Sequence, residues 1–132
     1  MAEANDIYGT AFKNGSVTLL ARIVDQNGGN LLQGDLSALK YTVYILDDQN
    51  ADSRTAVEGH VNVPLNIAEV VFNTLQMAPV WTLDTLGYNF RHVLDVSTHQ
   101  AFTVAGRRYL LEYQLVPLAG QTILVRFRIN VI

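Results

Sequence analysis

Cysteine is absent from this 132-residue chain. A disulfide scaffold, a thiolate zinc site and a cysteine nucleophile are therefore excluded together. Charge is also scarce, because Asp, Glu, Lys and Arg make up 16% of the residues, against roughly 25% in an average protein. A surface so poor in charge is either poorly soluble or partly covered in an assembly.

The sequence also lacks runs of basic or apolar residues. Its nine Lys and Arg residues are spread along the chain and the net charge is −3, so we expect no nucleic-acid binding through phosphate contacts. No apolar stretch approaches the roughly 20 residues of a membrane-spanning helix. Residues 1–6 are polar and acidic, without the basic and apolar regions of a signal peptide. We therefore expect a protein that is made in the cytoplasm and does not enter a membrane.

Two segments near the C-terminus alternate apolar and polar residues with the period of a β-strand. They are residues 106–116 and 122–132, and they predict a β-hairpin. Directly opposed residues must lie on one face of a sheet, and a five-residue loop over residues 117–121 satisfies this condition. That loop pairs Tyr113 with Val125, Glu112 with Arg126, and Leu110 with Arg128.

The rest of the chain is also rich in short strand patterns. Further strands are expected at residues 17–24, 40–47, 57–63, 88–96 and 101–104. Residues 67–75 fit either a strand or a short helix, and we favour the strand because the run from Val70 to Phe72 is β-favouring. Residues 1–15 are polar and predict a flexible N-terminal arm. Residues 16–132, with about six to eight short strands, predict a single all-β domain, an antiparallel immunoglobulin-like β-sandwich.

Apolar residues on the outward side of several expected strands point to a docking surface. A solvated sheet face is normally polar, yet the outward positions here include Leu20, Tyr44, Leu46, Leu110 and Leu124. Together with the scarcity of charge, these residues predict self-association or docking onto a protein partner. We therefore expect a non-enzymatic structural protein that acts through protein–protein contacts.

The loop after the second expected strand matches half of a calcium-binding loop. Asp48, Asn50 and Asp52 place oxygen ligands at alternate positions. Ser53 stands where that loop needs glycine, and Gly59 stands where it needs a bidentate glutamate. We therefore expect no calcium site here, and we interpret the residues as a solvated loop.

Other chemistry-bearing residues show no catalytic or metal-binding spacing. The three histidines are His60, His92 and His99. None of them belongs to a local metal-ligand motif. The serines lie in no Gly-x-Ser-x-Gly elbow, and the carboxylate pairs fall in expected loops. The sequence therefore predicts neither an enzyme nor a bound cofactor.

A group of aromatic residues leaves one alternative function open. The platform for a stacked sugar would consist of Trp81, Tyr88, Phe90 and Tyr44, with Asp84 and Asn89 as hydrogen-bonding groups. A lone tryptophan in a β-sandwich is more often part of the core. The alternative is a carbohydrate-binding module of the same architecture. Such a module should keep its non-binding sheet face polar, and this chain does not.

Several segments together resemble a known class of proteins. They are WTLDTLGYNFRH at residues 81–92, AGRRYLLEY at residues 105–113, VTLLAR at residues 17–22 and YTVYILD at residues 41–47. In this order they resemble small immunoglobulin-like sandwich proteins of phage and prophage structural genes, and are similar to the N-terminal domain of phage baseplate upper proteins. The resemblance implies a docking part of a virion or virion-like particle, in the tail, baseplate, neck or capsid decoration. It implies no catalytic residues.

Overall fold

The computed structural model describes residues 7–25, 28–47, 49–50, 53–79, 81 and 85–132. Its strands are β1 (Ile7–Ala11), β2 (Thr18–Ala21), β3 (Leu36–Leu46), β4 (Arg54–Ala56), β5 (Val63–Pro64), β6 (Val71–Gln76), β7 (Tyr88–Val93), β8 (Arg108–Pro117) and β9 (Ile123–Val131). A short helix, α1 (Ile67–Val70), precedes β6, and a 3₁₀ turn (Gln33–Asp35) precedes β3. The fold is all-β, as the sequence predicts.

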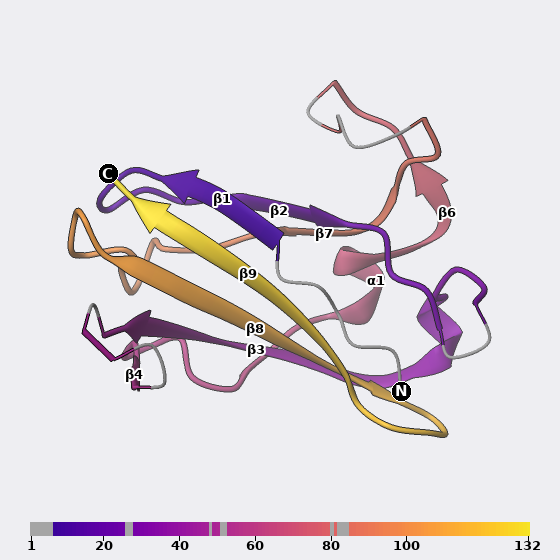
Figure 1. Cartoon of the computed structure of the whole chain (residues 1–132). Coiled ribbons are helices and arrows are strands. Elements are labelled where there is room, and N and C mark those ends of the chain that lie inside the picture. The colour runs from indigo at the N-terminus through magenta and orange to yellow at the C-terminus, as the bar shows by residue number, and fades with distance from the viewer. Residues whose placement is uncertain (1–6, 26–27, 48, 51–52, 80, 82–84) are drawn as a thin grey trace.

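The strands form two sheets with the core between them (Figure 1). The larger sheet has the order β1-β9-β8-β3-β4, and β5 pairs with β3 beside this path. The smaller sheet has the order β2-β7-β6. The described residues thus contain nine strands, where the sequence predicts six to eight, because β1, β4 and β5 are too short to show a clear alternation.

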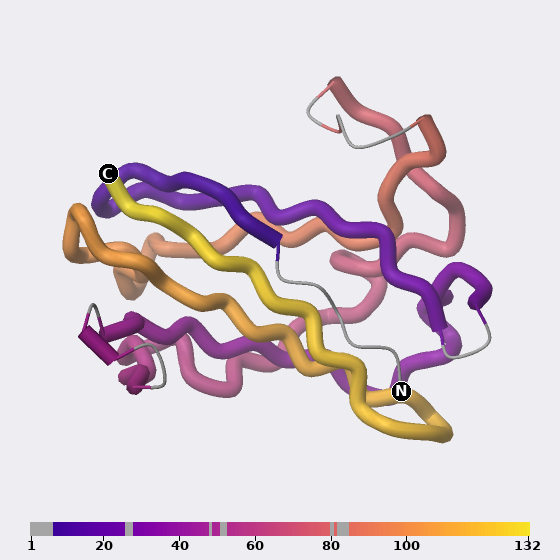
Figure 2. Tube along the Cα trace, in the orientation of Figure 1, coloured from indigo at the N-terminus to yellow at the C-terminus, as the bar shows by residue number. Residues whose placement is uncertain are grey.

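The first strand corrects two expectations. Residues 7–11, which the sequence places in the flexible arm, pair in parallel with β9 from Ile7 opposite Phe127 to Ala11 opposite Val131. Figure 2 shows these two segments running side by side. A sheet with this parallel edge is mixed rather than antiparallel. The strand is hard to predict because it has only five residues, and Gly9 and Thr10 interrupt its apolar pattern.

The segment that fits both a strand and a helix is divided between the two. The side chain of Asn66 accepts a hydrogen bond from the Ala68 N–H at 3.1 Å and caps the single turn of α1. From Val71 onward the chain is extended and forms β6. Our preference for a strand over all of residues 67–75 is therefore wrong for the first turn, because the asparagine cap favours helix locally.

Two other expected strands are replaced by turns and loops. In place of a strand over residues 57–63, the chain turns between β4 and β5, where the His60 N–H donates to the Val57 carbonyl at 3.0 Å. Residues 101–104 are not a strand either, although Ala101 and Phe102 are fully buried. Ala101 and Phe102 fill the core from a loop, and Val57 packs against the core partly buried. Val61 and Val104 are instead 48% and 42% exposed.

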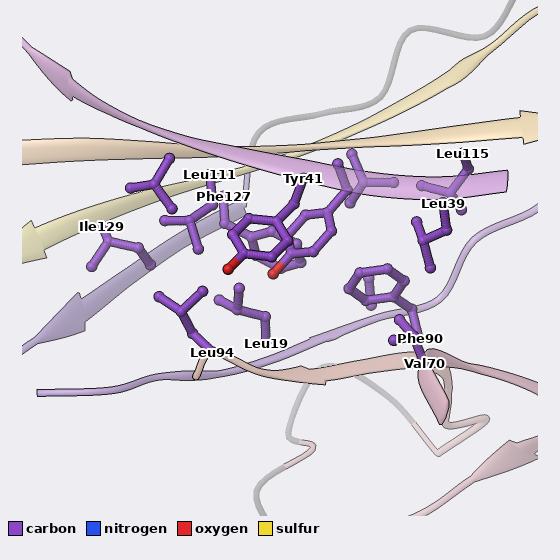
Figure 3. Packing of buried hydrophobic residues seen from close by; sticks show 14 of the residues in the cluster. Leu19, Leu39, Tyr41, Val70, Phe90, Leu94, Leu111, Leu115, Phe127 and Ile129 are labelled. Atoms are coloured by element: carbon purple, nitrogen blue, oxygen red, sulfur yellow. The ribbon is translucent and has the colours of Figure 1, made fainter. Parts of the chain in front are cut away.

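The core is built around aromatic rings contributed by both sheets (Figure 3). Phe90 of β7 meets Tyr113 of β8 edge-on, with ring centroids 5.0 Å apart, and Phe127 of β9 packs against both rings. The ring centroid of Tyr41, on β3, lies 5.7 Å from that of Tyr113. Rings of this size remove much apolar surface from water, at roughly 25 cal/mol per Å², so the two sheets are held together mainly here.

The register of the final hairpin is the one that the sequence predicts. Glu112 lies opposite Arg126, Tyr113 opposite Val125, and Leu110 opposite Arg128. The prediction follows from parity alone: both strands bury odd-numbered residues, so only a loop with an odd number of residues keeps the faces in phase.

A hydrogen bond fixes the entry into β8. The hydroxyl of Tyr109, which is fully buried, accepts from the Val104 N–H at 3.1 Å. Phe102 packs edge-on against the same ring, with centroids 5.3 Å apart. The tyrosine therefore closes the turn that precedes its own strand.

Candidate docking face

The outward side of the larger sheet brings together side chains that are far apart in the sequence. Strand pairing aligns Tyr44 with Leu110, and Leu110 with Arg128. The neighbouring rows align Glu112 with Arg126 and Gln114 with Leu124. We call this surface the docking face; it comprises Tyr8, Lys40, Thr42, Tyr44, Leu46, Arg54, Arg108, Leu110, Glu112, Gln114, Leu124, Arg126 and Arg128.

The docking face concentrates positive charge. It holds five of the nine basic residues of the chain and one of its twelve acidic residues, which gives a net charge of +4. The whole chain carries −3, so the remainder carries −7. The sequence shows no basic run because the five residues are divided among β3, β4, β8 and β9. Such a separation of charge produces a directional electrostatic field that steers a charged partner.

The one acidic residue of the face is engaged within the sheet. Glu112 is 7% exposed, and its Oε2 lies 3.0 Å from Nε of Arg126 and 3.7 Å from Nη1 of Arg54. The guanidinium of Arg54 also lies over the ring of Tyr44, 4.2 Å from its centroid. The carboxylate thus engages two cations, and the described residues of the docking face include no unpaired negative charge.

The structure separates the five apolar residues that the sequence assigns to an interface. Tyr44 and Leu124 lie on the docking face and are half-buried. Leu46 and Leu110 share this side but are 8% and 3% exposed, because neighbouring long side chains can cover them with their stems. Leu20 lies opposite Arg91 in the smaller sheet, on the other side of the molecule. The expectation of five exposed residues on one surface is therefore wrong for Leu20, Leu46 and Leu110.

A second group of polar side chains lies inside the sandwich. Nε2 of His60 lies 2.7 Å from the carbonyl oxygen of His99, so this nitrogen carries the proton and donates. Nδ1 of the same ring lies 2.8 Å from the Tyr41 hydroxyl. Burial, together with the nearby charge of Asp95, raises the pKa of Tyr41 to about 12. This chain of bonds ties β3 to two loops.

A parallel arrangement links the smaller sheet to the larger one. Nδ1 of His92 lies 2.6 Å from the Tyr113 hydroxyl. Burial lowers the pKa of His92 to about 4 and raises that of Tyr113 well above its usual value. Both rings are therefore neutral near pH 7, and they satisfy each other's polar groups in the core.

A groove of about 310 Å³ lies next to His92. Glu69, Arg91 and Asp95 line it beside the imidazole. Asp95 is held by the N–H and hydroxyl of Ser97, at 2.9 Å and 2.6 Å. Among the described residues, no three histidine or acidic side chains are grouped so as to hold a metal ion.

The aromatic residues of the alternative function do not form one platform. Trp81 is 7% exposed and packs against Tyr88, with ring centroids 5.7 Å apart, while Phe90 is fully buried. Tyr44 belongs to the other sheet. Trp81 therefore contributes to packing. Asp84, the expected hydrogen-bonding partner, lies outside the described residues, as do Asp48 and Asp52 of the half calcium loop.

Comparison with protein-family models, curated proteins and solved structures finds no match to this chain. Within the described residues, no helix has the length and apolarity needed to span a membrane.

Proposed function

We propose that this protein is a non-enzymatic assembly component of a phage or phage-like particle, and that it acts through the docking face. The observation that carries the proposal is the composition of this face. Tyr44 and Leu124 lie half-buried among four arginines and one lysine. Protein interfaces are enriched in tyrosine and arginine and combine apolar contacts with a polar rim.

The strand order supports an immunoglobulin-like sandwich of the variable type, the fold that the sequence resemblance implies. In that arrangement β2, β7 and β6 correspond to strands of one sheet. The other sheet of the variable type has an additional strand next to the one that corresponds to β3. The order β9-β8-β3-β4 fits this description. The bond from the Val104 N–H to Tyr109 at the start of β8 resembles the tyrosine corner of such domains.

Co-purification with the products of adjacent structural genes tests the proposal. The protein is co-expressed with the neighbouring portal, tail or capsid proteins, and the complexes are resolved by size-exclusion chromatography. We expect the wild-type chain to enter a complex and Leu124→Glu to be lost from it, because a charge then replaces an apolar contact on the docking face. The matched control is Leu118→Glu in the hairpin loop, where the leucine is 70% exposed and the variant should enter the complex.

Two results would contradict the proposed function. The first is a chain that stays a dilute monomer with every neighbouring gene product. The second is a complex that both variants enter equally, since the contact would then lie elsewhere. Circular dichroism and a melting curve must show that Leu124→Glu remains folded.

A further inference from the structure

The positive charge of the docking face is only partly neutralised within the molecule. Glu112 engages Arg126 and Arg54. In the described part of the chain, the side chains of Arg108 and Lys40 make no hydrogen bond or ion pair. The side chain of Arg108 is exposed and that of Lys40 is half-exposed. These two cations lie on neighbouring strands, β8 and β3, of the same sheet. The face therefore offers charge to a partner rather than to its own fold.

The same charge disfavours a symmetric pairing of two docking faces. A face-to-face dimer would bring two surfaces of net charge +4 together, and like charges at an interface cost several kcal/mol. Among the other described acidic residues, Glu69 and Asp95 line one groove together with Arg91, which adds a positive charge there. The remaining ones belong to different turns: Asp25, Asp35, Asp47 and Glu58.

We propose that the docking face binds an acidic surface of a different protein, an inference that rests on the assembly function proposed above. Arg108 and Lys40 supply the long-range attraction, and Leu124 supplies the apolar contact. Opposite charges on the two surfaces steer the encounter and fix the orientation of the partner.

The aromatic side chains favour a protein over a nucleic acid. Single-stranded nucleic acids bind to platforms on which successive bases stack. On the docking face the ring of Tyr44 is already covered by the guanidinium of Arg54, at 4.2 Å. Among the described residues of the docking face, the other aromatic side chain is Tyr8, which is 74% exposed on the edge strand. Phe12, which is 72% exposed, lies just beyond that strand and outside the docking face. A covered ring and one open ring on the face suit an interface anchor better than a base-stacking track.

Binding of a labelled acidic polypeptide tests the inference. The probe is fluorescent poly-L-glutamate, measured by anisotropy against the full chain at low and at physiological salt. The test variant is Lys40→Glu with Arg108→Glu. The matched control is Lys13→Glu with Arg91→Glu, two exposed residues away from the docking face. Both double variants make the same change in net charge, so only the position of the charge differs between them.

We expect wild type and control to bind the probe and the test variant to bind about tenfold more weakly or not at all. Binding should weaken as salt rises, because the Debye length falls to roughly 8 Å at 0.15 M. Equal loss in both double variants, or no binding by the wild type, would overturn the inference. So would tighter binding of an oligothymidylate through the same two residues.

Sedimentation of the isolated protein completes the test. Self-association that the Lys40→Glu, Arg108→Glu variant abolishes would show that the face binds a second copy, and the inference would fail. The proposed function fails separately, when the neighbouring structural proteins give no complex although poly-L-glutamate still binds. If a complex forms, but neither the Lys40→Glu, Arg108→Glu variant nor added salt weakens it, the assembly function stands and the acidic partner is rejected.

Discussion

Glu112 and Arg126 face each other across the C-terminal hairpin, with Oε2 3.0 Å from Nε. Because Arg54 lies farther from the same oxygen, at 3.7 Å, the two arginines should contribute unequally. A double-mutant cycle with Glu112→Gln and Arg126→Gln should give a coupling of about 1 kcal/mol in the free energy of unfolding. The control cycle with Arg54→Gln should give less. Equal couplings would contradict the unequal geometry.

Leu110 and Leu124 should respond differently to truncation, although they occupy the same side of the sheet. Leu110 is 3% exposed, so Leu110→Ala should lower the free energy of unfolding by about 2–4 kcal/mol through the cavity that it leaves. Leu124 is half-buried, so Leu124→Ala should cost about 1 kcal/mol or less. Urea denaturation measures both. A smaller loss for Leu110 would mean that its cover is not part of the fold.

His92 should make the stability depend on pH. Burial lowers its folded-state pKa to about 4 from a usual 6.5, so below pH 6.5 the unfolded chain binds a proton that the folded chain does not. The free energy of unfolding should therefore decrease as pH falls from 6.5 to about 4, by about 2 kcal/mol after a discount for partial exposure. Thermal melting across this range measures the effect.

The control for this pH dependence is His92→Gln, whose amide oxygen can still accept from Tyr113 but does not titrate. The variant should lose the slope between pH 6.5 and 4. The pKa of Asp95 is lowered from 3.8 by the hydrogen bonds from Ser97, so its stabilising effect is lost only at more acidic pH. An unchanged slope in the variant would assign the dependence to another group.

The bond between Tyr109 and the backbone of Val104 should contribute to stability. Tyr109→Phe removes the hydroxyl and leaves the Val104 N–H without its partner at 3.1 Å, at an expected cost of about 1 kcal/mol. Tyr44→Phe is the matched control, because in the described structure the Tyr44 hydroxyl makes no hydrogen bond. Equal denaturation midpoints for the two variants would show that the bond between Val104 and Tyr109 adds nothing to the free energy of unfolding.

Gly59 and Gly28 have the same backbone angle, φ = 85°, but different surroundings. A Cβ at residue 28 meets nothing within 4 Å, whereas one at residue 59 overlaps the side chain of His99. Gly28→Ala should therefore cost about 1 kcal/mol from backbone strain alone. Gly59→Ala should cost about 2 kcal/mol or more, because His99 must also move. Similar melting temperatures for the two would show that His99 yields freely.

The features that the sequence predicts are local or follow from parity. The register that sets Glu112 opposite Arg126 needs only the alternation of two adjacent strands and the length of their loop. The sequence does not predict edge strand β1, because its partner strand lies more than one hundred residues away: Ile7 pairs with Phe127. Its five residues also carry too weak an alternation by themselves.

The docking face could not be predicted from the sequence for a related reason. Its five cations lie on four strands, and only the order β9-β8-β3-β4 places them on one surface. The burial of Leu110 also depends on neighbours from other strands, since Tyr44 and Arg128 lie on either side of it. A position that faces outward in a strand is therefore not always exposed, because long side chains can cover it.

The position of β9 constrains the order in which the chain can fold during synthesis. This strand lies inside the larger sheet, between β1 and β8, although the ribosome makes it after all the other described strands. The earliest strand, β1, must wait for the latest to emerge before it can pair. Until residues 123–131 are available, the edges of β1 and β8 that pair with β9 remain open, and unpaired strand edges favour aggregation. Such dependence on distant pairing should make folding slow and make the chain sensitive to interrupted translation.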